Sequence, residues 1–166
     1  MIFEVIDNPN LKDYEDFEKI YQEMVGRKSM SYSLSVEQIK MLCKTEDFQL
    51  FFILHGNIRI AGIIIYKRKA HAGGGFAATN KISLELSASF FMYNALFDYL
   101  SQKSFKTFDM EKLVPSTKPI NSVFLFKNGV EGKHIVLNGE WSWYKNLYYR
   151  PLMYFVKKYL MKKREL

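Results

Sequence analysis

The residues best placed for chemistry lie within positions 121–141, which read NSVFLFKNGVEGKHIVLNGEW. Lys127 follows a run of large apolar side chains at 123–126 and precedes a glycine-containing turn at Asn128-Gly129. A lysine at the edge of a core segment can offer positive charge to a developing oxyanion or to a phosphate. Backbone N–H groups of the turn can share that task. The alternative is a lysine that simply leaves the core where its helix ends, and the residues alone favour it.

Asp109 and Glu111 are the acidic residues best placed to act as bases, because they lie near the end of a short predicted strand at 106–110. Forming an amide from a thioester or an ester needs a group that takes the proton of the amine. The alternative for both is a carboxylate that lies in solvent, as is common at strand ends. His55, His71 and His134 are scattered without the spacing of metal ligands, so we expect no metal site.

The charge is uneven along the chain. Through Phe48 there are ten acidic and six basic residues, a net of −4, and the remainder carries +11, which gives the total of +7. An excess of this kind suggests that the C-terminal part meets an anionic partner, although solubility alone also explains it. Lys157 and Lys158 lie on a predicted C-terminal helix at 150–166 and are candidates to bind tRNA or anionic lipid headgroups. The alternative is a solvated helix face.

The order of predicted elements is mixed, and it indicates a single α/β (α+β) domain over 1–166. A strand at 1–6 precedes helices at 10–25 and 35–44, and Ser35 or Ser33 is the expected N-cap of the second helix. Residues 48–70 form two strands with a tight turn at Gly56-Asn57, and a glycine-broken strand follows at 71–80. The glycine run at 73–75 indicates flexibility or a bulge. The remaining elements are a central helix at 87–105 with Ser87 or Ser89 as cap, the strand at 106–110, a short helix or bent strand at 118–129, a strand at 132–141 and the C-terminal helix.

This element order resembles the acyltransferase fold of the GNAT superfamily. The motifs FDM at 108–110 and LFKNGVEGKHIVLNGEW at 125–141 resemble one domain of the Fem-type peptidoglycan-bridge aminoacyltransferases. The resemblance implies a mixed, mostly antiparallel sheet that is flanked by helices and split in the middle. The split would lie between the strand at 71–80 and the strand that ends at Asp109, and it would admit the acyl donor.

The resemblance also implies which residues form the site. Lys127 and Asp109 would be catalytic, whereas Phe126, Asn128, Gly129 and Gly132 would bind substrate together with Lys157 and Lys158. The sequence departs from the Fem-type pattern at four positions near these residues, which are Glu111, Lys112, Val130 and Glu131. These departures favour a rival interpretation, in which the same fold is a non-catalytic binding module or one half of a heteromeric transferase.

The donor is left open between acyl-CoA and aminoacyl-tRNA. Members of the superfamily that use coenzyme A usually carry a glycine-containing loop before the long helix, and positions 80–89 here read NKISLELSAS. The expected activity is transfer of an acyl or aminoacyl group to an amine of a small-molecule or lipid-linked cell-envelope precursor. Fem-type enzymes have two such domains, so homodimerisation or a smaller substrate would complete the site. A basic peripheral membrane or RNA-binding protein is a further alternative, and a cytoplasmic location, with or without membrane contact, is expected.

Overall fold

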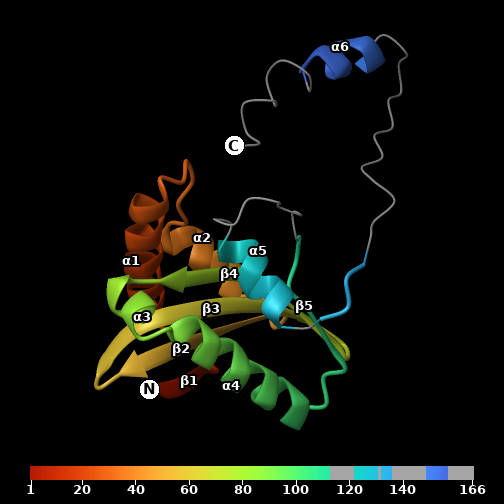
Figure 1. Ribbon diagram of the computed structural model, residues 1–166. Helices are drawn as coiled ribbons and strands as arrows, with labels where there is room; N and C mark the ends of the chain where they lie inside the picture. The colour runs from red at the N-terminus through yellow and green to blue at the C-terminus, as the bar shows by residue number, and fades with distance from the viewer. Residues whose placement is uncertain (113–121, 131, 136–148, 157–166) are drawn as a thin grey trace. The chain divides into compact units, whose positions relative to one another are not determined.

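The computed structural model describes residues 1–112, 122–130, 132–135 and 149–156. The chain divides into two compact units, Met1–Gly129 and Val130–Leu166, and we describe each by itself. The first unit holds a five-stranded sheet in the order β1-β2-β3-β4-β5 (Figure 1). The neighbouring pairs are antiparallel except β4 and β5, which are parallel. The predicted α/β class, with a mixed and mostly antiparallel sheet flanked by helices, is confirmed.

The described elements follow the predicted order, with one additional short helix, α3. In chain order they are β1 (Ile2–Ile6), α1 (Leu11–Lys28), α2 (Val36–Cys43), β2 (Phe48–His55), β3 (Ile58–Arg68), β4 (His71–Thr79), α3 (Lys81–Glu85), α4 (Ala88–Gln102), β5 (Thr107–Asp109), α5 (Ser122–Gly129) and α6 (Tyr149–Val156).

Two apolar layers hold the sheet between helices. Successive side chains of a strand point to opposite faces, so Phe52 and Phe51 of β2 enter different layers. Phe52 packs with Phe17 of α1 on one face, and Phe51 packs with Leu96 of α4 on the other face. Figure 1 shows α1 and α2 on one side of the sheet and α4 on the other side. Each fully buried side chain of this size stabilises the fold by roughly 1.5–3 kcal/mol.

Side-chain caps start the first two helices. Asn10 forms a capping box with Asp13 at the start of α1, and Ser35 forms another with Gln38 at the start of α2, which confirms the predicted Ser35 cap. Ser87 is the N-cap residue of α4, but it lies in the left-handed region with φ 52° and makes no side-chain cap hydrogen bond. The expectation that a serine hydroxyl caps α4 was therefore wrong.

The turns and the short helix of the first unit also match the sequence pattern. Gly56 has φ +60°, which the predicted Gly56-Asn57 turn requires of its glycine. Residues 122–129 form α5, so the helical alternative for that region is the correct one. In the second unit, residues 132–135 are not in a strand, and the rest of the strand predicted at 132–141 lies outside the described residues.

The two strands between which the split was predicted, β4 and β5, are neighbours in the sheet. The two strands are neighbours over three register pairs, from His71 opposite Thr107 to Gly73 opposite Asp109. Ile64 faces Phe76 on β4, whereas Ile65 faces Gly74, so Gly75 is an extra residue and forms a bulge. Within the described chain, the part of β4 beyond Gly73 pairs only with β3. The described strands thus show a short β5 beside a longer β4, and the predicted split stays a prediction.

Candidate functional site

A row of three residues crosses the sheet where β4 and β5 begin to separate. Tyr66 of β3 is the register partner of Gly73 on β4, and Gly73 is the register partner of Asp109 on β5. Gly73 has no side chain, and a Cβ built on it would lie 2.3 Å from the Cζ and hydroxyl oxygen of Tyr66. The Tyr66 ring therefore lies directly over Gly73 and reaches towards the neighbouring strand.

The Tyr66 side chain crosses Gly73 towards Asp109, its partner in the same row. Burial raises the pKa of Tyr66, and the negative charges of Asp109 and Glu111 raise it further, while Arg68 acts in the opposite direction. The phenol thus stays protonated at neutral pH, so its hydroxyl is a donor on the side of the sheet where Asp109 offers an acceptor.

The chain directly after β5 turns sharply around the Asp109 side chain. The backbone N–H of Glu111 donates to Asp109 Oδ1 at 2.7 Å, and Glu111 itself has φ 60°, a conformation that residues with side chains rarely adopt. Partial burial raises the pKa of the Glu111 carboxyl, Lys127 lowers it and Asp109 raises it, and the net change is upward. Glu111 as a whole is solvent-exposed, so its desolvation is only partial.

Lys127 of α5 hydrogen-bonds the backbone of this turn. Its ammonium group donates to the carbonyl oxygen of Met110 and, at 3.1 Å, to that of Lys112. An ammonium has three N–H donors, so these two hydrogen bonds leave one for a further acceptor. We call Tyr66, Asp109, Glu111 and Lys127 the Asp109 cluster. The structure thus brings together Lys127 and Asp109, the two residues predicted to be catalytic.

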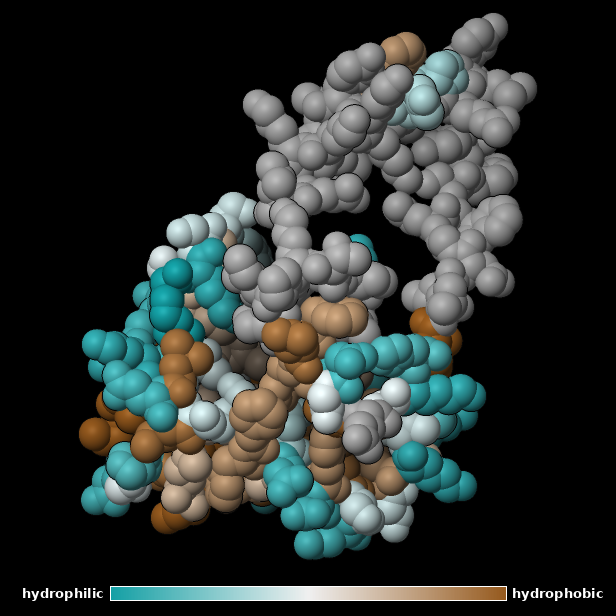
Figure 2. All heavy atoms as spheres, viewed as in Figure 1, coloured by the Kyte–Doolittle hydropathy of each residue, from teal (hydrophilic) through white to brown (hydrophobic). Residues whose placement is uncertain are grey.

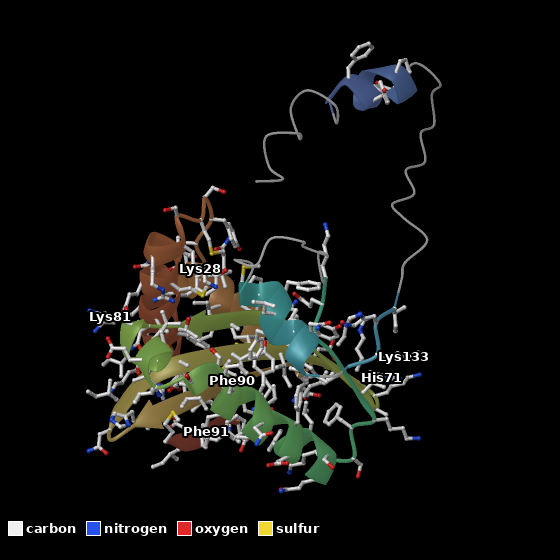
Figure 3. The ribbon with its side chains drawn as sticks, viewed as in Figure 1. Lys28, His71, Lys81, Phe90, Phe91 and Lys133 are labelled. Atoms are coloured by element: carbon white, nitrogen blue, oxygen red, sulfur yellow. The ribbon has the colours of Figure 1, made fainter. Side chains whose placement is uncertain are left out.

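Aromatic rings fasten α5 to α4 beside the Asp109 cluster. The Phe126 ring lies 5.0 Å from the ring of Phe90 and 5.2 Å from that of Tyr93, centroid to centroid. Burial raises the pKa of Tyr93 to about 12, and the Glu111 charge contributes to the rise. Figure 3 shows Phe90 projecting from α4 towards α5. The predicted substrate-binding residue Phe126 thus packs between helices.

The surface above α4 and α5 is apolar in part. Figure 2 shows brown side chains gathered in the centre of this face between teal, hydrophilic ones. The large apolar residues that these elements and α3 leave exposed are Ile82, Leu84, Leu86, Phe90, Val123 and Leu125.

The remaining predicted site residues have no described contact with the Asp109 cluster. Asn128 and Gly129 are exposed at the end of α5, and a Cβ built on Gly129 meets nothing within 4 Å. Gly132 belongs to the second unit, and Lys157 and Lys158 lie outside the described residues. In the described part of the chain, no group of histidine, cysteine, aspartate and glutamate side chains could hold a metal ion.

Sequence reasoning missed Tyr66, Gly73 and Tyr93. The residue pattern offered one usable signal for Gly73, since a tyrosine and a glycine in adjacent antiparallel strands can form a register pair. It offered no signal for Tyr93, which lies within an aromatic helix that reads as core.

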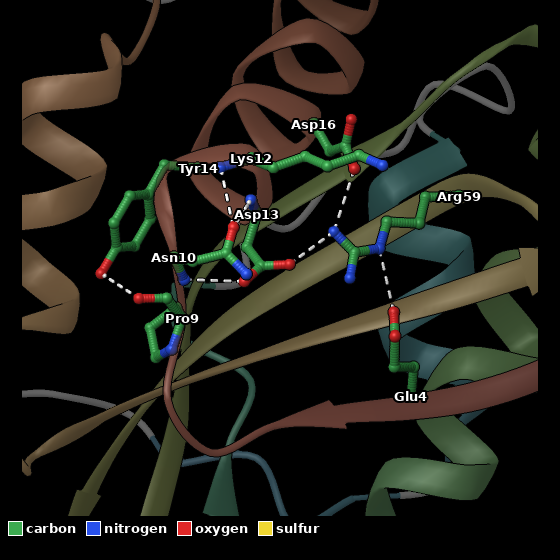
Figure 4. A network of polar contacts seen from close by, with 8 residues as sticks. All are labelled: Glu4, Pro9, Asn10, Lys12, Asp13, Tyr14, Asp16 and Arg59. Atoms are coloured by element: carbon green, nitrogen blue, oxygen red, sulfur yellow. Dashed lines mark hydrogen bonds and ion pairs between the residues drawn. The ribbon is translucent and has the colours of Figure 1, made fainter.

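A second polar cluster lies between α1 and the β1–β3 part of the sheet (Figure 4). Arg59 Nε contacts Glu4 at 2.9 Å, and its Nη1 atom contacts Asp13 at 2.7 Å and Asp16 at 3.0 Å. The guanidinium carbon also lies 4.1 Å from the centroid of the Phe52 ring. Burial lowers the pKa of Arg59, but the hydrogen bonds that Arg59 donates to Glu4 and Asp13, together with their negative charges, outweigh it, so the pKa is raised. We call these residues, apart from Phe52, the Arg59 cluster.

A pocket of about 540 Å³ opens beside the Arg59 cluster. The carboxylates of Glu4, Asp13 and Asp16 line it, and all are already paired with Arg59. We therefore place the candidate chemistry at the Asp109 cluster, where charges are less well matched, and not at this pocket.

Several solved structures of similar fold are acetyltransferases. The chain superposes with a TM-score of 0.61 and 14% identity on an aminoglycoside acetyltransferase from an uncultured soil metagenomic sample, solved with sisomicin, covering 86% of this chain and 96% of that one. The ribosomal-protein-S18-alanine N-acetyltransferase of Escherichia coli gives a TM-score of 0.59 and 11% identity over 79% of this chain and 77% of that one. The PaiA N-acetyltransferase of Thermoplasma acidophilum, solved with coenzyme A, gives 0.56 and 12% over 77% and 89%.

These comparisons show the fold alone: the chain shares the fold of these acetyltransferases, in agreement with the GNAT-like fold expected from the element order. No family model matches the sequence, and no curated protein matches it. Among the residues that the structure describes, no helix combines the length and apolarity needed to cross a bilayer.

Proposed function

We propose that this chain is an N-acyltransferase that moves an acyl group from a thioester or ester donor to an amine. The observation that carries the proposal is the place where β4 and β5 part. There Asp109 ends the pairing of β5 with β4 opposite Gly73, and the N–H of Glu111 donates to its carboxylate. The Gly75 bulge lies two residues further along β4, in the part that pairs with β3 alone. The similar folds of acetyltransferases, one of them solved with coenzyme A, support it.

The chemistry follows from these groups. The amine nitrogen attacks the donor carbonyl carbon, a C–N bond forms, and the C–S bond of a thioester, or the C–O bond of an ester, breaks. Asp109 or Glu111 accepts the proton that the amine loses, and the leaving thiolate or alkoxide takes a proton from solvent. Backbone N–H groups at the bulge and the third N–H of Lys127 are the donors proposed for the oxyanion.

Acyl-CoA is the donor that we test first, because a structure of similar fold holds coenzyme A. The segment between β4 and α4 is occupied by α3 and contains no glycine, which keeps aminoacyl-tRNA as the second donor to test. For the acceptor we propose an amine of a cell-envelope precursor, because residues 125–141 resemble the Fem-type motif. Asn128, Gly129, Gly132, Lys157 and Lys158 are proposed to contact the anionic donor or this acceptor, and a homodimer would complete the site.

The test is a panel of acyl-CoAs and aminoacyl-tRNAs incubated with amino sugars and with amine-bearing peptidoglycan peptides. Thiol release is followed for the CoA donors and amide formation by mass spectrometry for all donors. Acyl transfer with any pair of donor and amine supports the proposal. The productive donor then shows whether the enzyme uses acyl-CoA or aminoacyl-tRNA. Donor binding without transfer in the whole panel would instead support the non-catalytic module.

Lys127→Ala is the variant that tests the site. Losing one oxyanion donor typically lowers turnover by roughly two to three orders of magnitude. Lys112→Ala is the matched control, because its exposed side chain is lost while the backbone carbonyl that Lys127 contacts remains. A folded Lys127→Ala protein with unchanged turnover would show that Lys127 is a surface residue without a role in catalysis.

A further inference from the structure

We propose that Tyr66 is a positioning residue for Asp109, and that Gly73 is a glycine because only then can the Tyr66 ring cross β4 to reach that carboxylate. This inference rests on the proposed acyl transfer and assigns roles to two residues outside the predicted site.

The register of three strands carries the geometry. Tyr66, Gly73 and Asp109 are consecutive partners across β3, β4 and β5. A side chain longer than hydrogen at the middle position would meet the ring, since a Cβ there lies 2.3 Å from two atoms of Tyr66 and 2.6 Å from a third. Distances below 3.0 Å are not seen between real Cβ atoms and their neighbours, so the ring would have to move.

The neighbouring glycine provides a natural contrast. A Cβ built on Gly74 would lie 3.8 Å from Cζ of Phe108 and 4.0 Å from the carbonyl oxygen of Asp109, which are ordinary van der Waals contacts. Gly74 thus tolerates a methyl group where Gly73 does not. The requirement for glycine at position 73 therefore comes from Tyr66 and not from crowding of the whole strand.

Two donors from different elements orient the Asp109 carboxylate. The N–H of Glu111 donates to Oδ1 from the turn after β5. In the proposed arrangement the Tyr66 hydroxyl is the second donor, because the ring lies over Gly73 in the row that ends at Asp109. A carboxylate held at two points presents its remaining lone pairs in one direction, which a proton acceptor for an incoming amine requires. Without the hydroxyl, the Asp109 side chain would keep only the local contact of its own turn.

The first measurement needs no substrate. Tyrosine labelled with ¹³C at Cζ gives an NMR signal that reports ionisation, and Tyr66→Phe identifies the signal of Tyr66. We expect the pKa of Tyr66 to fall in Asp109→Asn, because the largest neighbouring charge is removed while Glu111 and Arg68 remain. Gly73→Ala should lower it as well, since the ring is pushed away from Asp109, whereas Gly74→Ala should leave it unchanged.

The second measurement uses the donor and amine that prove productive. Tyr66→Phe keeps the ring over Gly73 and removes only the hydroxyl, so kcat should fall about tenfold while KM for the amine stays within about twofold. Gly73→Ala should lower kcat to a similar extent, and Gly74→Ala should not.

The outcomes separate this inference from the proposed function. A Tyr66 titration that is the same in Asp109→Asn as in the wild type would overturn the inference, whatever the activity. Tyr66→Phe with wild-type kcat would overturn it too. Absence of transfer by the wild type with every donor would instead overturn the proposed function. The titrations would then still show whether Tyr66 contacts Asp109. If Gly73→Ala does not fold, the Tyr66→Phe and Asp109→Asn pair is sufficient.

Discussion

The Arg59 cluster and the Asp109 cluster both gather acidic side chains at the sheet, but they treat charge differently. In the Arg59 cluster three carboxylates surround one guanidinium at 2.7–3.0 Å. In the Asp109 cluster the only cation donates to backbone carbonyls, and the acids raise the pKa of Tyr66 and of Tyr93. Matched charge stabilises a fold, whereas unmatched charge is kept where a proton must move.

The largest effect should come from the Asp109 cluster. Asp109→Asn keeps the oxygen that accepts the Glu111 N–H but cannot take a proton, so turnover should fall by roughly two to four orders of magnitude. Thermal unfolding should change little, because the side chain lies at the end of a short strand. Steady-state kinetics with the productive donor checks this. A fall in stability equal to the fall in activity would show that the residue is structural and would erase the contrast between the clusters.

The Arg59 cluster should show the reverse behaviour. Arg59→Met leaves three carboxylates without their cation, one of them on the buried Asp13, and we expect a loss of about 3 kcal/mol in the free energy of unfolding. Urea denaturation measures the loss, and Arg68→Met, at the exposed end of β3, is the control. The folded fraction of Arg59→Met should retain wild-type turnover. Selective loss of turnover instead would assign the pocket beside Arg59 to the active site.

Substitution of Phe126 tests whether this side chain packs between helices or contacts the substrate. Phe126→Leu removes the ring contacts with Phe90 and Tyr93 and should destabilise the protein by about 1 kcal/mol. Because α5 also carries Lys127, KM and kcat should both change modestly. Differential scanning fluorimetry with kinetics measures both, and Val123→Ala, an exposed position on the same helix, serves as control. Unchanged stability with a large rise in KM would instead restore direct substrate binding.

The smallest effect concerns the pH dependence of stability. The folded-state pKa of Glu111 is raised from its ordinary value of 4.5, so the folded protein binds more protons than the unfolded chain between 4.5 and the raised value. The contribution of Glu111 is fully present below pH 4.5 and is lost as the pH rises through that window. Glu111→Gln should therefore flatten this part of the stability curve, as followed by urea midpoints from pH 4 to 7. An unaltered curve would show that Lys127 fully offsets the burial.

The sequence allowed the fold to be predicted because its signals are local. Helical spacing, the Ser35 cap, the Gly56-Asn57 turn and the glycine bulge each depend on neighbours in the chain. The buried face of α4 is harder to obtain from the sequence. Phe90, Tyr93, Phe97 and Leu100 recur at helical spacing, but the structure buries Ala88, Met92, Leu96 and Leu100 and leaves Phe90 64% exposed. A helix that is apolar all round does not reveal its inner face by periodicity.

The candidate site was only half accessible to sequence reasoning, for a physical reason. Asp109 and Lys127 stood out as charges at the ends of apolar segments. The link between Tyr66 and Asp109 depends on the register of two strand pairs, and register is set by packing and turn geometry that no short motif encodes.

The half-paired edge of β4 has a consequence for amide hydrogen exchange. Amide hydrogens of β4 that point to β3 are held in a ladder, whereas beyond Gly73 those on the opposite side have no described strand to receive them. Hydrogen exchange along this strand should therefore alternate between slow and fast, residue by residue, and the alternation should begin at the bulge. A donor lying against that edge would slow the fast amides alone. Hydrogen exchange of β4 therefore reports whether a donor is bound at this edge, and it needs neither a labelled donor nor turnover.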